Sequence, residues 1–208
     1  MKKDTPIKWL FFDLGSTLVD ETKCIEYRIE ETLKQENAPV REVFFACMEK
    51  MIENNQLPYK DAVKEFGLEQ VKWPKELEQL YEDVPWVLQT LAGKYKMGII
   101  ANQSLGSEER MRNWGILDYF EVIAASAEAG VAKPDKRIFE LALEKSEAKP
   151  EECYMIGDRL DNDIIPAKEM GMQTIWVRQS WFGKGNVELA AEKPDVIVER
   201  LEEILEYL

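Results

Sequence analysis

Side chains able to bind a cation and a negatively charged group follow the apolar runs of this sequence. They are Asp13 and Thr17 after the first run, Asn102 after the second, Lys133 after the third, and Asp158, Asp161 and Asp163 after the fourth. Carboxylate oxygens are the ligands that Mg²⁺ prefers, together with waters and a phosphate oxygen. A lysine beside them can neutralise negative charge that develops on the same group. These residue types predict a magnesium-assisted reaction, provided that the fold brings their positions together.

The runs that precede these side chains have the pattern of buried parallel strands. They are short and almost continuously apolar, and they occupy residues 7–12, 97–101, 122–125, 153–156, 174–177 and 195–198. Amphipathic segments accompany the later runs, at residues 134–145, 162–170 and 200–208. Strands of this kind are covered on both faces, and strands that alternate with helices form βαβ units. We therefore predict an α/β fold with a Rossmann-like, doubly wound parallel sheet, in which ligands bind outside the carboxyl ends of the strands.

Residues 20–84 interrupt this alternation, because they contain helical patterns and no convincing strand. The predicted helices cover residues 20–36, 39–54, 59–66 and 74–82, and prolines separate them. We predict that this segment is a helical cap domain inserted after the first strand. The core domain would then consist of residues 1–19 and 85–208.

The composition excludes several kinds of catalysis and partner. The 208 residues include no histidine, which removes Ser-His-Asp and Cys-His catalysis and histidine-bound zinc. Lys and Arg number 27 against 40 Asp and Glu, and this net charge of −13 disfavours nucleic acid and anionic membranes as partners. The three cysteines are far apart, and we expect no signal peptide, membrane-spanning stretch or nucleotide-binding motif. We predict a cytoplasmic protein with reduced thiols; its oligomeric state cannot be predicted from this pattern.

Taken together, the four motifs at the strand ends resemble those of the haloacid dehalogenase superfamily, which is dominated by Mg²⁺-dependent phosphatases. That family carries an Asp, a second Asp two residues later and then a Thr after the first strand, and these positions are Asp13, Gly15 and Thr17 here. The family's Lys before a helix matches Lys133, and its Gly-Asp-x-x-x-x-Asp motif matches residues 157–163. The helical insert has the place of the family's cap, so the resemblance covers essentially the whole chain.

The resemblance implies a hydrolase that forms an aspartyl-phosphate on Asp13, the nucleophile. The implied Mg²⁺ ligands are Asp13, the backbone carbonyl of Gly15, Asp158 and Asp163. Lys133 would pair with Asp13 and with the phosphoryl oxygens, and Asp163 would orient Lys133 or a metal-bound water. Thr17 and Asn102 would help to hold the phosphoryl group. The expected substrate is a small phosphorylated molecule.

Two positions depart from the family's motifs. Gly15 stands where the phosphatases carry the Asp that protonates the leaving oxygen and then activates water, a role worth about 10²–10⁴-fold in rate. Ala101 lacks the hydroxyl that closes the second strand, and Ser16 and Ser104 are candidates to replace it. Asp20 is a candidate for a displaced acid–base group, but a helix N-cap explains it better. Alkyl phosphates are therefore expected to be slow substrates.

Three functions remain compatible with the sequence. The preferred one is a phosphatase whose leaving groups need little protonation, or one in which another group supplies the proton. The second is a catalytically weak or inactive family member that binds a phosphorylated ligand or a protein. The third is a 2-haloacid dehalogenase, because halide leaves without a proton and the family's dehalogenases also lack an Asp at position 15. Those enzymes work without a metal, whereas the acidic cluster around Asp158 suits one.

Overall fold

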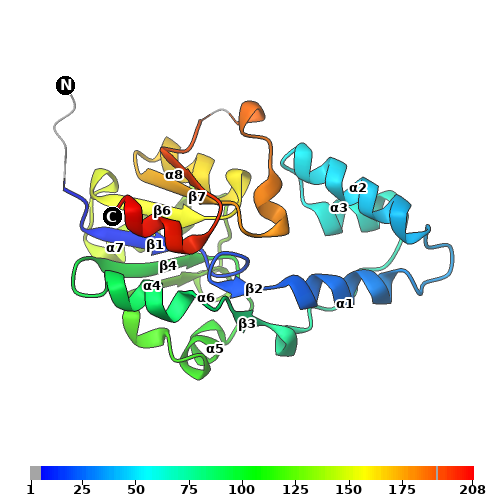
Figure 1. The fold of residues 1–208 in the computed structure, drawn as a ribbon, viewed down its shortest axis with the longest axis horizontal. Helices are drawn as coiled ribbons and strands as arrows, with labels where there is room; N and C mark the ends of the chain where they lie inside the picture. The colour runs from blue at the N-terminus through cyan, green and yellow to red at the C-terminus, as the bar shows by residue number, and fades with distance from the viewer. Residues whose placement is uncertain (1–5, 191) are drawn as a thin grey trace.

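The computed structural model describes residues 6–190 and 192–208, and a parallel β-sheet lies at its centre (Figure 1). Within these residues six strands form the sheet in the order β5-β4-β1-β6-β7-β8. Their bounds are β1 Trp9–Phe12, β4 Lys96–Ala101, β5 Val122–Ala125, β6 Cys153–Gly157, β7 Gln173–Val177 and β8 Val196–Val198. The predicted fold class is confirmed, and each predicted run coincides with one of these strands apart from its end residues.

Both faces of the sheet are covered, because successive side chains of a strand point to opposite faces. Leu10 and Phe12 of β1 pack on one face with α4 (Val84–Leu91) and with the 3₁₀ turn η7 (Leu201–Glu206). Trp9 and Phe11 pack on the other face with α7 (Lys136–Ser146) and α8 (Ile165–Glu169). Two shorter helices, α5 (Ser107–Asn113) and α6 (Ser126–Ala129), follow β4 and β5. This double cover explains why the strands are apolar at nearly every position.

Three helices, α1 (Thr22–Thr32), α2 (Arg41–Glu53) and α3 (Pro58–Glu65), form a lobe beside the sheet (Figure 1). They enclose an apolar cluster of their own, which includes Ile29, Phe44, Met48 and Tyr59. These helices lie where the sequence predicts helical structure after the first strand. The division into a core of residues 1–19 and 85–208 and a cap of residues 20–84 stays a prediction, and residues 1–5 and 191 lie outside the described residues.

Residues 74–82 are not the helix that the sequence predicts. They form a single 3₁₀ turn, η1 (Lys75–Leu77), followed by the short strand β3 (Gln79–Leu80). β3 pairs antiparallel with β2 (Val19–Asp20), so a two-stranded ribbon joins the helical lobe to the sheet. The apolar spacing of so short a segment suits either structure, and pairing with a strand about 60 residues away decides between them.

Two amphipathic segments are wound differently from the helices that were expected. Residues 200–208 contain the 3₁₀ turn η7, in which Leu201 and Ile204 are buried. Residues 162–170 start inside a π-helical turn, η4 (Leu160–Ile164), and continue as α8. π turns are frequent at functional sites because they shift one residue relative to the regular helix. Here the shifted turn contains Asp163.

Two further predictions concern membrane-spanning helices and the cysteine side chains. In the part of the chain that the structure describes, no helix has the length and apolar composition needed to cross a membrane. Cys24, Cys47 and Cys153 are free cysteines, as predicted.

Candidate active site

The register of neighbouring strands brings the predicted side chains to one edge of the sheet. Phe12 of β1 aligns with Ile99 of β4 and with Ile156 of β6. The backbone N–H of Asp13 donates to the carbonyl of Ile156 (2.9 Å), which continues the β1–β6 ladder by one residue. Asp158 follows Ile156 by two positions, so both carboxylates emerge at the carboxyl edge of the sheet, where open α/β sheets bind ligands.

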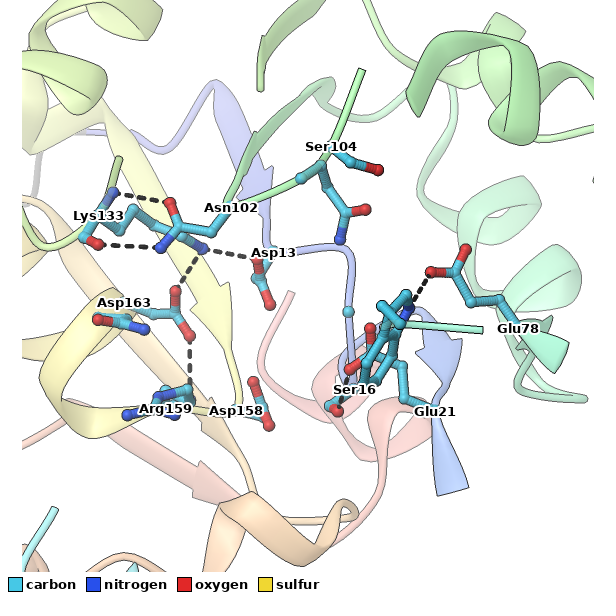
Figure 2. Close-up of a pocket in the computed structure, with 14 residues that line it drawn as sticks. Asp13, Ser16, Glu21, Glu78, Asn102, Ser104, Lys133, Asp158, Arg159 and Asp163 are labelled. Carbon is cyan, nitrogen blue, oxygen red and sulfur yellow. Dashed lines mark hydrogen bonds and ion pairs between the residues drawn. The ribbon is translucent and has the colours of Figure 1, made fainter. Parts of the chain in front are cut away.

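Lys133 lies between two carboxylates (Figure 2). Its Nζ donates to Oδ1 of Asp13 and to Oδ1 of Asp163, both at 2.6 Å. The lysine is only 5 % exposed. Burial acts to lower the pKa of Lys133, but the two carboxylates outweigh burial and hold this pKa above its ordinary value. The ammonium group therefore remains charged and fixed beside Asp13.

Asn102 holds the backbone of Lys133 in place. Its Nδ2 donates to the carbonyl of Lys133 (2.9 Å), and its Oδ1 accepts from the N–H of the same residue (2.8 Å). The sequence predicts that Asn102 binds phosphate through its side chain or its backbone. In the structure the side chain positions Lys133, and this leaves the backbone after β4 as the part of Asn102 that can face a ligand.

Two carboxylates come from the segment after β6, and hydrogen bonds fix each of them. Oδ2 of Asp158 accepts from the Ser180 hydroxyl (2.7 Å), and Oδ2 of Asp163 accepts from the backbone N–H of Arg159 (3.0 Å). A Cβ atom at Gly157 would lie 2.5 Å from Oδ2 of Asp163, so only glycine permits this close approach. Both oxygens of Asp163 are engaged, one with Lys133 and one with Arg159.

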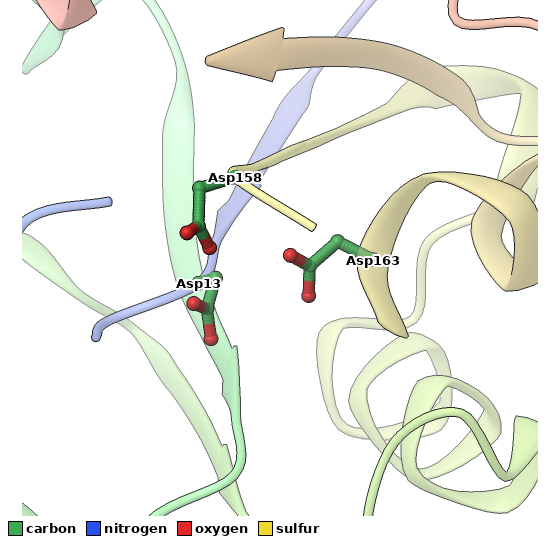
Figure 3. A group of neighbouring side chains, drawn as sticks. All are labelled: Asp13, Asp158 and Asp163. Atoms are coloured by element: carbon green, nitrogen blue, oxygen red, sulfur yellow. The ribbon is translucent and has the colours of Figure 1, made fainter. Parts of the chain in front are cut away.

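Asp13, Asp158 and Asp163 converge on one small space (Figure 3). One carboxylate oxygen from each lies within 4.8 Å of the others, and all three residues are buried. Burial raises the pKa of Asp13 to about 6 in spite of Lys133, and burial with the charge of Asp13 raises the pKa of Asp158 well above its ordinary value. Three buried carboxylates share the single ammonium group of Lys133, so the cluster has a net negative charge. Hard oxygen donors with uncompensated negative charge are what a Mg²⁺ ion fits.

Two other candidate residues lie apart from this cluster. Asp161 forms an ion pair with Arg159 (2.5 Å) and does not belong to the group of converging carboxylates among the described residues. Thr17 is fully buried and does not line the pocket described below, and its Oγ1 is a buried hydroxyl without a hydrogen-bond partner in the described part of the chain. Its predicted contact with phosphate would need the loop after β1 to rearrange.

Glu21 is a site residue that sequence reasoning missed, and it lies against Gly15. A Cβ atom at Gly15 would be 2.6 Å from Oε1 of Glu21 and 3.0 Å from Oε2. The Ser16 hydroxyl donates to Oε2 (2.8 Å), and burial raises the pKa of Glu21 to about 8 against the effect of that hydrogen bond. Asp20 accepts from the N–H of Thr22 (2.9 Å) at the start of α1, but the N-cap position that was predicted for it is occupied by Glu21.

The segment after the helical lobe closes the other side of a pocket of about 380 Å³. Trp73 and Glu78 line it, together with Gln103 and Ser104 from the loop after β4. The indole N–H of Trp73 donates to Oε1 of Glu78 (2.7 Å), and Arg110 pairs with Oε2 of Glu78 (3.0 Å). Arg28 of the lobe is not among the described residues that line this pocket, because its guanidinium stacks on Tyr59, 3.7 Å from the ring centroid.

Comparisons with known proteins show which family the chain is similar to. A family model described as haloacid dehalogenase-like hydrolase matches residues 10–177. The chain is 30% identical to a glyceraldehyde 3-phosphate phosphatase of Pyrococcus furiosus, with 97% of this chain and 93% of the relative aligned. It is 27% identical to the pyrophosphatase PpaX of Bacillus cereus, with 97% and 96% aligned. Among solved structures, a HAD phosphatase from Thermococcus onnurineus superposes with a TM-score of 0.67 at 24% identity, covering 97% of each chain.

Proposed function

Since the chain belongs to the haloacid dehalogenase-like hydrolases, we propose that it is a Mg²⁺-dependent phosphatase that forms a phosphoryl-enzyme on Asp13. The observation that carries this proposal is the position of Asp13, 2.6 Å from the ammonium group of Lys133 and grouped with Asp158 and Asp163. A nucleophilic carboxylate, a fixed cation and a cation-binding acidic cluster are the parts that phosphoryl transfer requires. The proposed substrates are small phosphorylated molecules, the class named for the relatives of known activity.

The side chains have separate tasks in this mechanism. An oxygen of Asp13 attacks phosphorus while the bond from phosphorus to the leaving oxygen breaks, and water later attacks the phosphoryl group to restore the carboxylate. Lys133 stabilises the charge on the phosphoryl oxygens, and Asp163 and Asn102 hold Lys133 in position. Asp13, the Gly15 carbonyl and Asp158 would hold Mg²⁺, with Asp163 beside them. A bound Mg²⁺ would supply charge neutralisation and orientation of the phosphate.

Removal of the metal is expected to abolish phosphate release and to lower stability. Chelation should stop turnover, and added Mg²⁺ should restore it. At a free Mg²⁺ concentration of about 100 times its Kd, the metal should raise the unfolding free energy by about 2.7 kcal/mol. Asp158→Asn should abolish this stabilisation without destabilising the metal-free protein, because it removes one of three buried carboxylates. Phosphate release and denaturant unfolding, each with and without Mg²⁺, measure both effects. Turnover that continues in chelator contradicts the proposed role of Mg²⁺.

The charges that line the pocket predict a preference for an uncharged leaving alcohol. Among the described lining residues five have carboxyl groups, at positions 13, 21, 78, 158 and 163. Glu21 is protonated at neutral pH and Glu78 is paired with Arg110, but the lining cations Lys133 and Arg159 are also ion-paired, so neither is free to bind a substrate carboxylate. Glyceraldehyde 3-phosphate and 3-phosphoglycerate have the same carbon chain and differ in an aldehyde against a carboxylate. We expect kcat/KM to favour the aldehyde by at least about tenfold, or 1.4 kcal/mol. Equal values, or a preference for the carboxylate, would show that the pocket does not discriminate by charge.

The two other functions predict different results in the same assays. A binding protein would bind Mg²⁺ and inorganic phosphate but release no phosphate from any ester. A dehalogenase would release halide from 2-haloacids in the presence of chelator. The convergence of three buried carboxylates favours the phosphatase over the dehalogenase, because a metal-free reaction has no use for so much uncompensated negative charge.

A further inference from the structure

We propose that Glu21 is the general acid and base of this phosphatase, in the place of the side chain that Gly15 lacks. The inference rests on the proposed function. It adds a proton-transfer group that the motifs at the strand ends do not contain, and it removes the reason to expect that alkyl phosphates are poor substrates.

The first argument is the position of the Glu21 carboxyl group. Its Oε1 occupies the point 2.6 Å from where a side chain at position 15 would begin, and it lines the same pocket as Asp13. Figure 2 shows Glu21 on the opposite side of Asp13 from Lys133 and Asp163. A phosphoryl group that reaches Asp13 beside Lys133 would therefore direct its leaving oxygen into the part of the pocket that Glu21 lines.

The second argument is the backbone that returns Glu21 to this point. Ser16 has a left-handed backbone conformation (φ 60°), which few residues other than glycine adopt. The N–H groups of Leu18 and Val19 both donate to the carbonyl of Leu14 (2.9 Å each), so the chain folds back tightly after Asp13. The Ser16 hydroxyl then binds Oε2 of Glu21 and leaves Oε1 on the side of Gly15. A strained turn that fixes one carboxyl group is typical of a functional site.

The third argument is that, among the described residues that line the pocket, the carboxyl groups other than those of Asp13 and Glu21 already have another role or partner. Asp163 is bound by Lys133 and Arg159, and Asp158 belongs to the proposed metal site. Glu78 is bound by Trp73 and Arg110. Glu21 has a single hydrogen bond, from a neutral hydroxyl, and no ion pair with a cation in this part of the structure.

The proposed step balances in protons and bonds. As Asp13 attacks phosphorus, the bond to the leaving oxygen breaks and that oxygen takes the proton of the Glu21 carboxyl group. The Glu21 carboxylate then takes a proton from the water whose oxygen attacks the phosphoryl-enzyme. The bond between phosphorus and Asp13 breaks, inorganic phosphate leaves, and both carboxyl groups return to their starting states.

The test compares Glu21→Gln with the wild type on two kinds of leaving group. Glycerol 3-phosphate needs a proton on its leaving oxygen, whereas 4-nitrophenolate leaves without one. We expect Glu21→Gln to slow glycerol phosphate turnover by about 10²–10⁴-fold. With 4-nitrophenyl phosphate it should give a burst of about one nitrophenolate per enzyme, followed by slow turnover, because the base for the second step is missing. Glu26→Gln, an exposed change on α1, is the matched control.

The outcomes separate the inference from the proposed function. Glu21→Gln with full activity, or with the burst lost as completely as glycerol phosphate turnover, contradicts the inference while leaving the phosphatase intact. A wild type that hydrolyses neither substrate contradicts the phosphatase, and the inference with it. Denaturant unfolding of each variant checks that the fold is retained.

A second pair of variants tests the place of the carboxyl group. Gly15→Asp alone should not increase the rate, because its Cβ would collide with Glu21. Gly15→Asp combined with Glu21→Ala should turn over glycerol phosphate at least about tenfold faster than Glu21→Ala, because a carboxyl group returns to the same space. A large gain from Gly15→Asp alone, or none in the combined variant, would overturn the inference.

Discussion

Asp13→Asn should lower the rate of phosphate release by on the order of 10⁴-fold or more, as expected for removal of a nucleophile. The amide keeps the size of the side chain and an oxygen that can accept from Lys133, but it cannot form the acyl phosphate. The change also removes one of three buried carboxylates that repel one another, so the metal-free protein should unfold at the same denaturant concentration as the wild type or at a higher one. Loss of activity without loss of stability is the expected result.

The measurements are phosphate release and covalent labelling of the protein. Wild type that is quenched during turnover should carry one phosphoryl group that hydroxylamine removes, and Asp13→Asn should carry none. Asp118→Asn, a change at an exposed position in the turn before β5, is the control and should behave as the wild type. Substantial turnover by Asp13→Asn, or an equal amount of label in it, would disprove the proposed nucleophile.

Lys133→Met should lower both stability and activity. The lysine is buried between Asp13 and Asp163, and its removal leaves two buried carboxylates without their cation. Breaking a buried ion pair by removing one partner costs about 3–5 kcal/mol. We expect a loss of this size in the unfolding free energy measured in chelator. Activity should also fall by about 10²–10³-fold, because a fixed positive charge on the phosphoryl oxygens is lost.

A double variant separates these two effects. Lys133→Met with Asp163→Asn should recover part of the stability, because only one of the two carboxylates that lost their cation then remains charged, but it should recover none of the activity. Denaturant unfolding and phosphate release at saturating Mg²⁺ measure the two quantities. A double variant that regains activity along with stability would show that Lys133 acts on folding alone and makes no contribution to the reaction.

The fold and the centre of the site followed from the sequence because both depend on strand ends. In a parallel sheet the carboxyl ends of neighbouring strands lie at one edge, so residues that follow apolar runs must be neighbours there. Asp13, Lys133, Asp158 and Asp163 could be grouped in this way although up to 150 positions separate them. The segment at residues 74–82 could not be predicted, because its strand pairing depends on a distant partner.

The acid–base group that Gly15 lacks could not be located from the sequence, whereas the structure shows a carboxyl group at that place. From the sequence, Gly15 is a position without a proton-transfer group, in a chain that contains no histidine to replace it. Glu21 is only six residues away, but spacing along an irregular turn does not indicate which carboxylate returns to the site. Asp20 was considered for this reason, and it points instead to the start of α1. The turn fixed by Leu14 and Ser16 places the carboxyl group of Glu21, and not that of Asp20, against Gly15.

The sequence by itself thus determined the sheet, its order of helices and strands, and the carboxylates and lysine at its edge, because periodicity and strand ends are local properties. Only the tertiary structure decided what lies around them. It placed Glu21 against Gly15, fixed Lys133 through Asn102, and brought Trp73 and Glu78 into the lining of the pocket. These contacts depend on side-chain packing between segments that are distant in sequence or joined by irregular turns, where no periodic pattern specifies direction.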